Sequence, residues 1–474
     1  MLKRIIKKEI LTALRDTRLQ ICGGILVMLM LMAILVGKQG QELIATERAE
    51  AQAAMYDTWV NQGEKHPHGA AHFGQFAFKP KPVLSFLDIG LDNYTGVSVF
   101  LEAHKQNEIL FSNSQEGNGM TRFGELTAAL ILQILLPLLI VFLSFNTFTE
   151  EREEGTLKLL HAQGISMRKL FYGKSWGIYA MVMLIFLPLV LLAYLVLDDH
   201  SATLDQEVLI KFISLTASYA LYFFVFVLFS VLISAFARNS SLSLLSLIGL
   251  WIISCIVIPK ATANLADKVY PTPSQFEFKN AIKDKVKNGI DGHNPSDIRL
   301  ASLKEEVLEE YGVATIEELP VNWSGIAMQA GEEYTDQVYD QEFARIEENY
   351  KQQNRLSEWA AFINPYLAVR NLSMALAGTD FTHHIAFAKA AEGYRRAFVK
   401  KMNNDMEVNH KPGIAYGDYK IGEEMWTSIA PFSYQLPSLS NILSDQWRSI
   451  MALLLWTVVL MMLSYTLAPK IAKL

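Results

Sequence analysis

Six long apolar stretches constrain this chain more than any other feature. Each is long enough to cross the hydrocarbon core of a bilayer as a helix, which takes about 17–25 residues. They occupy residues 19–37, 126–149, 175–197, 211–236, 242–258 and 449–467. Hydrophobic residues make up 51% of the 474 residues, but long polar segments separate the apolar stretches. This pattern excludes a single soluble domain and predicts an all-α integral membrane protein with six transmembrane helices.

Charged residues between these stretches predict the orientation of the helices. Positive charge is in excess in residues 1–18 and 150–174, at Arg238, and at the C-terminal lysines. With six spans, these four segments fall on one side of the membrane. The loop at 198–210 falls on the other side and is acidic. The positive-inside rule therefore predicts that the N- and C-termini are cytoplasmic.

Two polar regions then lie outside the cytoplasm and form a module inserted after spans one and five. In the first, 38–125, a helix over 41–60 continues the first span outward, and a segment rich in Pro, Gly and aromatics predicts irregular structure with short strands. The second, 259–448, shows no convincing strand alternation. It is predicted to be mainly helical, with a long polar helix over 325–356.

Local signals in the second region predict helix ends and a small core. Asp297 or Ser296 can cap the start of a helix that Gly312 ends. The acidic pairs Glu332-Glu333 and Glu347-Glu348 are predicted to be solvated helix faces instead of acid–base pairs. The expected core side chains are Trp359, Phe362, Tyr366, Leu376 and Phe398.

Residues 1–18 place apolar side chains at helical spacing between lysines and arginines. A basic amphipathic helix of this kind lies in the headgroup region of a membrane. It either anchors the following span or makes a specific contact with a partner.

The loop at 150–174 is more patterned than a plain connector. Carboxylates surround Arg152, Gly155 and Thr156 offer a break and a cap, and leucines supply an apolar patch. Ser166 can cap a second short helix. We therefore predict a docking element on the membrane surface, and its candidate residues are Glu151, Glu153, Gly155, Thr156, Leu157, Leu159, Leu160, Ser166 and Arg168.

The same loop resembles the signature loop of ABC type-2 (type V exporter-like) permeases. The likeness rests on the order E-x-E-x-G-T-L-x-L-L, followed by Ser166 and by Gly173-Lys174 at the entry to a span. Gly164 departs from the pattern, because many members have Pro there. The segments from His68 to Gly74 and from Leu376 to Asp380 resemble a subgroup with a large uncharacterised extracytoplasmic domain.

This resemblance implies a set of partners for the chain. The loop would be a coupling loop that seats in an ATPase subunit, and two ATPase subunits would join two permease subunits, identical or homologous. No cofactor is expected on this chain, since ATP and Mg²⁺ would be bound by the ATPase. The location would be the bacterial inner membrane. The alternative interpretation of the loop at 150–174 is a generic connecting loop. The net charge of the chain, −6, gives no indication of nucleic-acid binding.

Three histidines at His66, His68 and His72 have a spacing that suits a metal site, which Asp88, His104, His383 or His384 could complete. Against this, Pro67 is expected to break the helical register. The alternative is a turn whose histidines cap backbone groups or stack on aromatic rings. We assign no metal ligand from the sequence.

The sequence gives little support for nucleotide binding, hydrolytic catalysis or ion-coupled transport by this chain. Gly173-Lys174-Ser175 resembles the end of a phosphate-binding loop, but Arg168 stands where that loop needs a glycine. No G-x-S-x-G or H-E-x-x-H motif occurs. The predicted span cores lack Asp, Glu, Lys and Arg, which disfavours an ion-coupled transporter.

These observations favour an ABC exporter permease that is not itself an enzyme. Its substrate would be amphipathic or peptide-like, because the fourth and fifth spans are aromatic and apolar. The alternative is a mechanical ABC membrane subunit that acts on envelope machinery through its outer module and transports nothing.

Overall fold

The computed structural model describes residues 2–109, 126–197, 205–287, 297–411 and 413–473. It is 77% helical, and the described part contains six helices long and apolar enough to cross a membrane. The all-α membrane class is thereby confirmed. The six are Leu19–Val60, Ala128–Glu153, Met167–Leu197, Gln206–Phe236, Ser240–Val269 and Trp447–Ala472. Residues 198–204 of the acidic loop lie outside the described residues.

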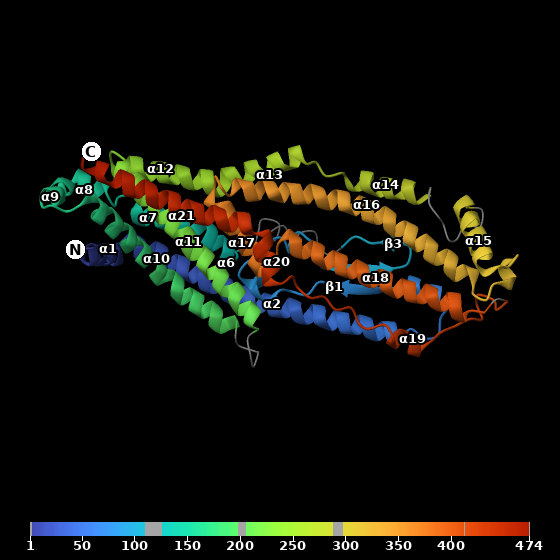
Figure 1. Cartoon of the computed structure of the whole chain (residues 1–474). Helices are drawn as coiled ribbons and strands as arrows, with labels where there is room; N and C mark the ends of the chain where they lie inside the picture. The colour runs from blue at the N-terminus through green and yellow to red at the C-terminus, as the bar shows by residue number, and fades with distance from the viewer. Residues whose placement is uncertain (1, 110–125, 198–204, 288–296, 412, 474) are drawn as a thin grey trace.

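The first of these helices runs without a break from the membrane part into the outer module (Figure 1). It is helix α2 (Thr17–Val60), and α1 (Leu2–Arg15) precedes it. At about 1.5 Å per residue, the 44 residues of α2 span roughly 66 Å. The hydrocarbon core takes only about 30 Å of this length, so the rest of α2 reaches into the outer module.

Spans two and five each contain a π-helical turn followed by a proline. Span two is built from α6 (Ala128–Leu130), η2 (Ile131–Leu135) and α7 (Leu136–Ser144). Span five is built from α12 (Ser240–Ile252), η3 (Ile253–Val257) and α13 (Ile258–Val269). Pro137 and Pro259 each stand second in the α-helix that follows the π turn. A proline lacks an N–H and crowds the preceding turn, so the wider turn accommodates it.

The remaining spans are single helices. They are α10 (Met167–Leu197), which contains Pro188, α11 (Gln206–Phe236) and α21 (Trp447–Leu467). The short η5 (Ala468–Lys473) follows α21. Both chain ends lie at the same end of the molecule, opposite the outer module (Figure 1).

The outer module contains a small antiparallel sheet covered by long helices (Figure 1). Its strands β1 (Gln75–Phe78), β2 (Ser98–Glu102) and β3 (Lys105–Gln106) pair in that order, with Phe76 opposite Phe100. The short strands expected in the first polar region are present. The other elements of this region are α3 (Pro67–Phe73) and η1 (Val83–Phe86).

The second polar region adds helices, as predicted. They are α14 (Gln275–Lys287), α15 (Ile298–Tyr311), η4 (Ile316–Glu318), α16 (Trp323–Ala360), α17 (Pro365–Ala377), α18 (Phe381–Asn409), α19 (Glu423–Thr427) and α20 (Leu439–Asp445). The side chain of Asp297 caps α15 by accepting from Arg299 N, and Gly312 ends it at φ 66°, so both predicted ends are confirmed. The alternative cap, Ser296, lies outside the described residues.

The predicted core of this region is partly wrong. Phe398 is buried beside Trp59 and Trp426 in the outer module. Tyr366 and Leu376 are buried too, but α17 packs against spans α11 and α21, so these side chains belong to the core of the membrane part. Trp359 is 57% exposed beside Arg448. It stands near the end of α16, where the outer module meets the spans, and a half-exposed Trp is common where apolar and wet surroundings meet.

Candidate ATPase-coupling site

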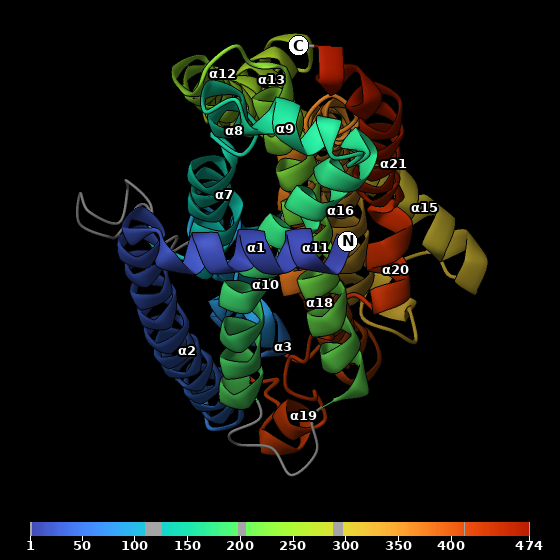
Figure 2. The ribbon, with the colours of Figure 1, turned by 90° about the vertical axis from the view of Figure 1, so that its left-hand side faces the viewer.

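The loop between spans two and three folds into two short helices across the end of the bundle (Figure 2). They are α8 (Thr149–Glu153) and α9 (Thr156–Ala162). Gly155 joins them at φ 76°, a left-handed conformation that glycine adopts without steric cost. Gly164 also has a positive φ, of 79°. The glycine that stands here, where many family members have Pro, therefore makes a second left-handed turn just before α10 begins.

Glu151 forms a partly buried charge cluster with α1 and α10. Its Oε1 lies 2.7 Å from Lys8 Nζ and 3.2 Å from Lys174 Nζ. Lys174, only 3% exposed, also reaches Glu9 Oε1 at 3.0 Å. Glu151 thus pairs with Lys8 and Lys174 and not with the basic residues near it in the loop, Arg152, Arg168 and Lys169. These partners stand at the start of the chain and about two helical turns inside α10.

Two glycines explain why α1 comes so close to α10. A Cβ on Gly173 would lie 2.7 Å from Ile5 Cγ2, and one on Gly177 would lie 2.6 Å from Glu9 Cβ. Only glycine leaves room for this crossing. Gly173-Lys174 is therefore a packing and pairing element within α10. Ser175 is buried and donates to Phe171 O at 2.9 Å, which is not the geometry of a phosphate-binding loop.

Arg152 and Glu153 connect α8 to the turn between spans four and five. The Arg152 guanidinium donates to Ala237 O at 2.5 Å and to Ala235 O at 2.6 Å, and so caps the C-terminus of α11. The Glu153 carboxylate accepts from Ser240 N at 2.7 Å and from Ser240 Oγ at 2.9 Å, at the N-terminus of α12. The positive guanidinium faces the negative end of the α11 helix dipole, and the negative carboxylate faces the positive end of the α12 helix dipole.

The three leucines of α9 do not share one exposed patch. Leu157 is 5% exposed and belongs to the membrane-part core, and Leu160 is half-buried against that core. Leu159 is 58% exposed on the outer face of the helix. The expectation that Leu157 anchors a partner is therefore corrected, because its side chain already packs within this chain. Thr156 supports the turn by donating to Glu151 O at 3.1 Å.

Ser166 and Arg168 lie at the start of α10. Ser166 is exposed and directly precedes this helix, so the second short helix expected here is instead the first turn of span three. Arg168 Nε donates to Tyr465 O at 3.0 Å, and its guanidinium stacks on the Tyr465 ring at 4.0 Å. The loop is thereby tied to span six as well. All nine predicted residues lie in the segment from Glu151 to Arg168. Through the contacts described above, this segment is connected to five of the six spans.

A buried polar network that the sequence analysis missed lies where the outer module meets the spans. Gln133 in span two donates to Tyr219 Oη in span four at 2.9 Å. The Tyr219 hydroxyl lies 2.7 Å from Ser373 Oγ on α17, and Ser373 donates to Asp88. Burial raises the pKa of the Asp88 carboxyl, although hydrogen bonds from Ser373 and Gly90 oppose the shift. In the sequence, the one sign of this network was a polar residue, Gln133, within an apolar span.

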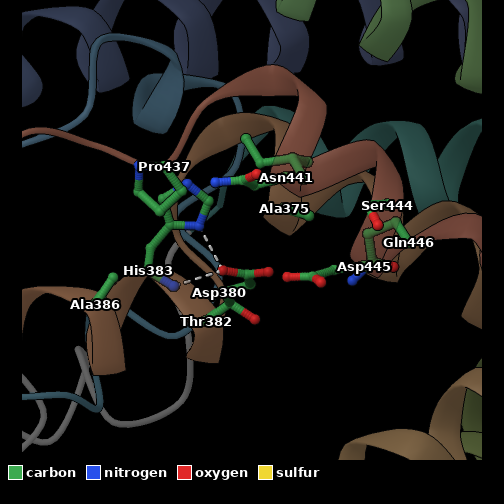
Figure 3. A pocket seen from close by; sticks show the side chains of 11 residues that line it. Ala375, Asp380, Thr382, His383, Ala386, Pro437, Asn441, Ser444, Asp445 and Gln446 are labelled. Carbon is green, nitrogen blue, oxygen red and sulfur yellow. Dashed lines mark hydrogen bonds and ion pairs between the residues drawn. The ribbon is translucent and has the colours of Figure 1, made fainter.

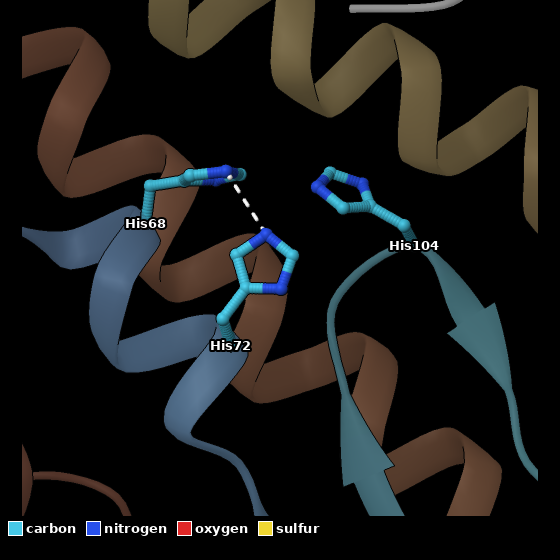
Figure 4. A group of neighbouring side chains, drawn as sticks. All are labelled: His68, His72 and His104. Carbon is cyan, nitrogen blue, oxygen red and sulfur yellow. Dashed lines mark hydrogen bonds between the residues drawn. The ribbon is translucent and has the colours of Figure 1, made fainter. Parts of the chain in front are cut away.

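The histidines of the outer module are arranged differently from the expectation. Pro67 does not break the helix but occupies its first turn, after His66 accepts from His68 N as the cap. His68 and His72 therefore stand one turn apart, and His104 faces them from the turn between β2 and β3 (Figure 4). His66 stacks instead on Tyr416. Asp88, His383 and His384 lie elsewhere.

The prediction that Glu332 belongs to a solvated face is wrong. Glu332 is 3% exposed, and its Oε1 lies 2.7 Å from His104 Nδ1. Its other oxygen lies 3.3 Å from the buried Arg395. The sequence of a long polar helix does not distinguish the charged residues that face a neighbouring helix from those that face solvent.

A cavity of about 320 Å³ beside α18 and α20 contains an Asp–His pair (Figure 3). Asp380 Oδ1 lies 2.6 Å from His383 Nδ1 and also accepts from His383 N at 3.0 Å. Asp380 is the N-cap of α18, so this pairing is that of a helix cap.

Two family models match the chain in different parts. Residues 108–255 match the "ABC-2 family transporter protein" model, and this range holds α8, α9, spans two to four and about half of span five. Residues 275–435 match the "Domain of unknown function (DUF3526)" model, which covers much of the outer module. No curated protein matches the chain. The first match and the six membrane-length helices support an ABC-2 type permease, a membrane component of an ABC transporter.

Proposed function

We propose that this chain is the permease subunit of an ATP-driven exporter in the bacterial inner membrane, and that α8 and α9 receive the motion of a separate ATPase subunit. One observation carries the proposal. The outer face of α9 offers Leu159 to a partner, while Glu151, Arg152 and Glu153 join α8 to spans three, four and five.

These contacts suit the transmission of force. Ion pairs and helix caps hold α8 to the ends of three spans, so a displacement of α9 moves those ends together. The ATPase would bind ATP and Mg²⁺ and perform the hydrolysis. This chain would contribute only docking and movement.

The transport pathway is proposed to lie between two permease subunits. Within one chain, the cavity lined by Met30, Leu132, Phe186 and Tyr219 amounts to only about 20 Å³, too small for an organic substrate. A second permease subunit, identical or homologous, would supply the other wall. The aromatic and apolar character of spans four and five supports an amphipathic or peptide-like substrate.

The mechanical alternative keeps one specific observation in its favour. Helix α2 is continuous from the membrane part into the outer module, and a stiff rod of this kind can transmit movement across the membrane. In that case the outer module would act on envelope machinery.

Vesicles that contain the chain and its ABC ATPase subunit separate these functions. The proposal predicts ATP hydrolysis coupled to accumulation of a fluorescent amphipathic peptide, with neither in vesicles that contain a hydrolysis-deficient ATPase. Hydrolysis without accumulation of any peptide from a mixed-sequence pool would favour the mechanical role. If no ATPase subunit binds the purified chain, both functions fail.

A labelling experiment tests the proposed orientation. Cysteines introduced at the exposed positions Asn61 and Glu333 should react with a membrane-impermeant thiol reagent in spheroplasts, whereas one at the exposed Gln163 should react only after permeabilisation. The background is Cys22→Ser, since Cys22 is exposed and Cys255 is buried. Labelling at 163 in intact spheroplasts would reverse the proposed orientation.

A further inference from the structure

Three imidazoles from two separate elements of the outer module converge on one point (Figure 4). His68 and His72 come from consecutive turns of α3, and His104 comes from the turn between β2 and β3. One nitrogen of each ring lies within 4.8 Å of the others. Neither family match accounts for this convergence.

The spacing fits a metal ion held by ring nitrogens. His68 Nε2 and His72 Nε2 are 3.2 Å apart, and the two rings are perpendicular. Zn–N bonds of about 2.0–2.1 Å in a tetrahedral site place neighbouring ligand nitrogens about 3.3 Å apart. The His104 ring centroid lies 5.2 Å from that of His68 and 4.9 Å from that of His72, and its ligand nitrogen lies within 4.8 Å of theirs.

Glu332 orients the third ring. Its Oε1 lies 2.7 Å from His104 Nδ1 and accepts from His104 N at the same distance. A proton on Nδ1 shared with this carboxylate leaves the lone pair on Nε2, and Figure 4 shows that nitrogen facing the other two rings. Metal-binding histidines usually have a carboxylate or carbonyl partner of this kind behind them.

The backbone and the nearby charges support the same interpretation. Among the described residues, His104 is the one non-glycine residue with a positive φ, 67°, and this conformation turns its ring toward α3. Behind Glu332 lie Asp336 and Glu392 with Arg395 and Arg396. With Asp340, which also pairs with Arg396, the carboxylates of this cluster outnumber its two guanidiniums, which favours a nearby cation.

We propose that His68, His72 and His104 form a binding site for a divalent transition-metal ion, with Zn²⁺ as the best match to three imidazoles. Mg²⁺ and Ca²⁺ prefer oxygen ligands and fit poorly. His72 is exposed, so the fourth position is open to water or another ligand from solvent. The ion would join α3 to the β2–β3 turn and, through Glu332, to α16. This inference does not depend on the proposed transport function.

The test is metal binding by the full-length protein, purified in detergent without a polyhistidine tag. Equilibrium dialysis should give one tightly bound Zn²⁺ per chain, unaffected by excess Mg²⁺. Co²⁺ in its place should show the visible absorption of a four-coordinate ion. Zn²⁺ should also raise the unfolding temperature, since an ion that binds only the folded state stabilises it.

Two variants remove ligands while sparing the fold. His72→Gln changes an exposed side chain, and His104→Asn keeps a residue that tolerates the left-handed backbone. Both should lose the bound Zn²⁺, the Co²⁺ spectrum and the thermal shift, yet elute like the parent protein. His161→Gln, an exposed histidine on α9, is the matched control and should retain all three. The proposal is wrong if the parent binds no Zn²⁺, or if His72→Gln binds it as tightly as the parent.

Discussion

Replacing Arg395 by alanine is expected to unfold much of the outer module. Arg395 is 1% exposed, and its guanidinium donates to Glu392 at 2.8 Å, approaches Glu332 Oε2 at 3.3 Å and contacts Asp336. The substitution leaves these carboxylates without their main counter-charge. Removing one partner of a buried ion pair typically costs about 3–5 kcal/mol.

The carboxylates around Arg395 are already costly to keep ionised. Burial raises the pKa of the Asp336 carboxyl to about 6, even though Arg395 and Arg396 oppose the shift. Without Arg395 the repulsion among these side chains increases. Arg395→Lys should be intermediate, because a lysine keeps the charge but cannot match several carboxylates with a planar fork.

Limited proteolysis of the outer module and the unfolding temperature of the purified protein measure the loss. The neighbouring Arg396 is the control. It is 30% exposed and pairs with the 60% exposed Asp340 as well as with Glu392 and Asp336, so Arg396→Ala should have a smaller effect than Arg395→Ala. Equal sensitivity of the two alanine variants would show that burial of the Arg395 network contributes little to stability.

The sequence predicts features of this fold that depend on local signals. Six apolar stretches were enough for the spans, because length and hydropathy alone decide whether a helix can cross a bilayer. Asp297 and Gly312 mark the ends of α15 because capping involves only neighbouring backbone groups. Neither the spans nor the ends of α15 depend on which distant residues of the chain lie nearby in the fold.

Features that depend on distant partners were not predictable in the same way. Leucines at 157, 159 and 160 look equivalent in the sequence, yet only packing against the spans decides that Leu157 is buried and Leu159 is exposed. The burial of Glu332 depends on Arg395, 63 residues away in the chain. Helix α17 has only 13 residues, too few to be recognised as part of the membrane bundle.

The histidines show a signal that was available and misread. Pro67 stands in the first turn of α3, where proline is favoured because its missing N–H costs nothing, so a proline here does not argue against a helix. With Pro67 at the start of a helix, His68 and His72 fall on one face at i and i+4. The approach of His104 depends on the sheet and could not have been found this way.

Replacing Leu159 by aspartate is expected to separate the permease from its ATPase while leaving the permease folded. The side chain is 58% exposed, so a charge there meets water in the isolated chain. In the proposed complex the same charge would face an apolar groove. Hot-spot side chains typically contribute about 2 kcal/mol or more to an interface, which corresponds to a roughly 30-fold or larger loss of affinity.

Two further variants make this result specific. Ile298→Asp introduces the same charge at an apolar position that is 82% exposed, at the start of α15 in the outer module, and should have no effect on the ATPase. Leu157→Asp should instead destabilise the permease itself, because that side chain is buried. The three variants separate docking from folding.

The most direct test of the proposed coupling is the amount of ABC ATPase subunit that co-purifies with each permease variant from membranes containing both proteins. We expect stoichiometric ATPase with the parent and with Ile298→Asp, and little or none with Leu159→Asp, while all three permeases elute as folded protein. Full recovery of the ATPase with Leu159→Asp would contradict the assignment of α9 as the docking helix.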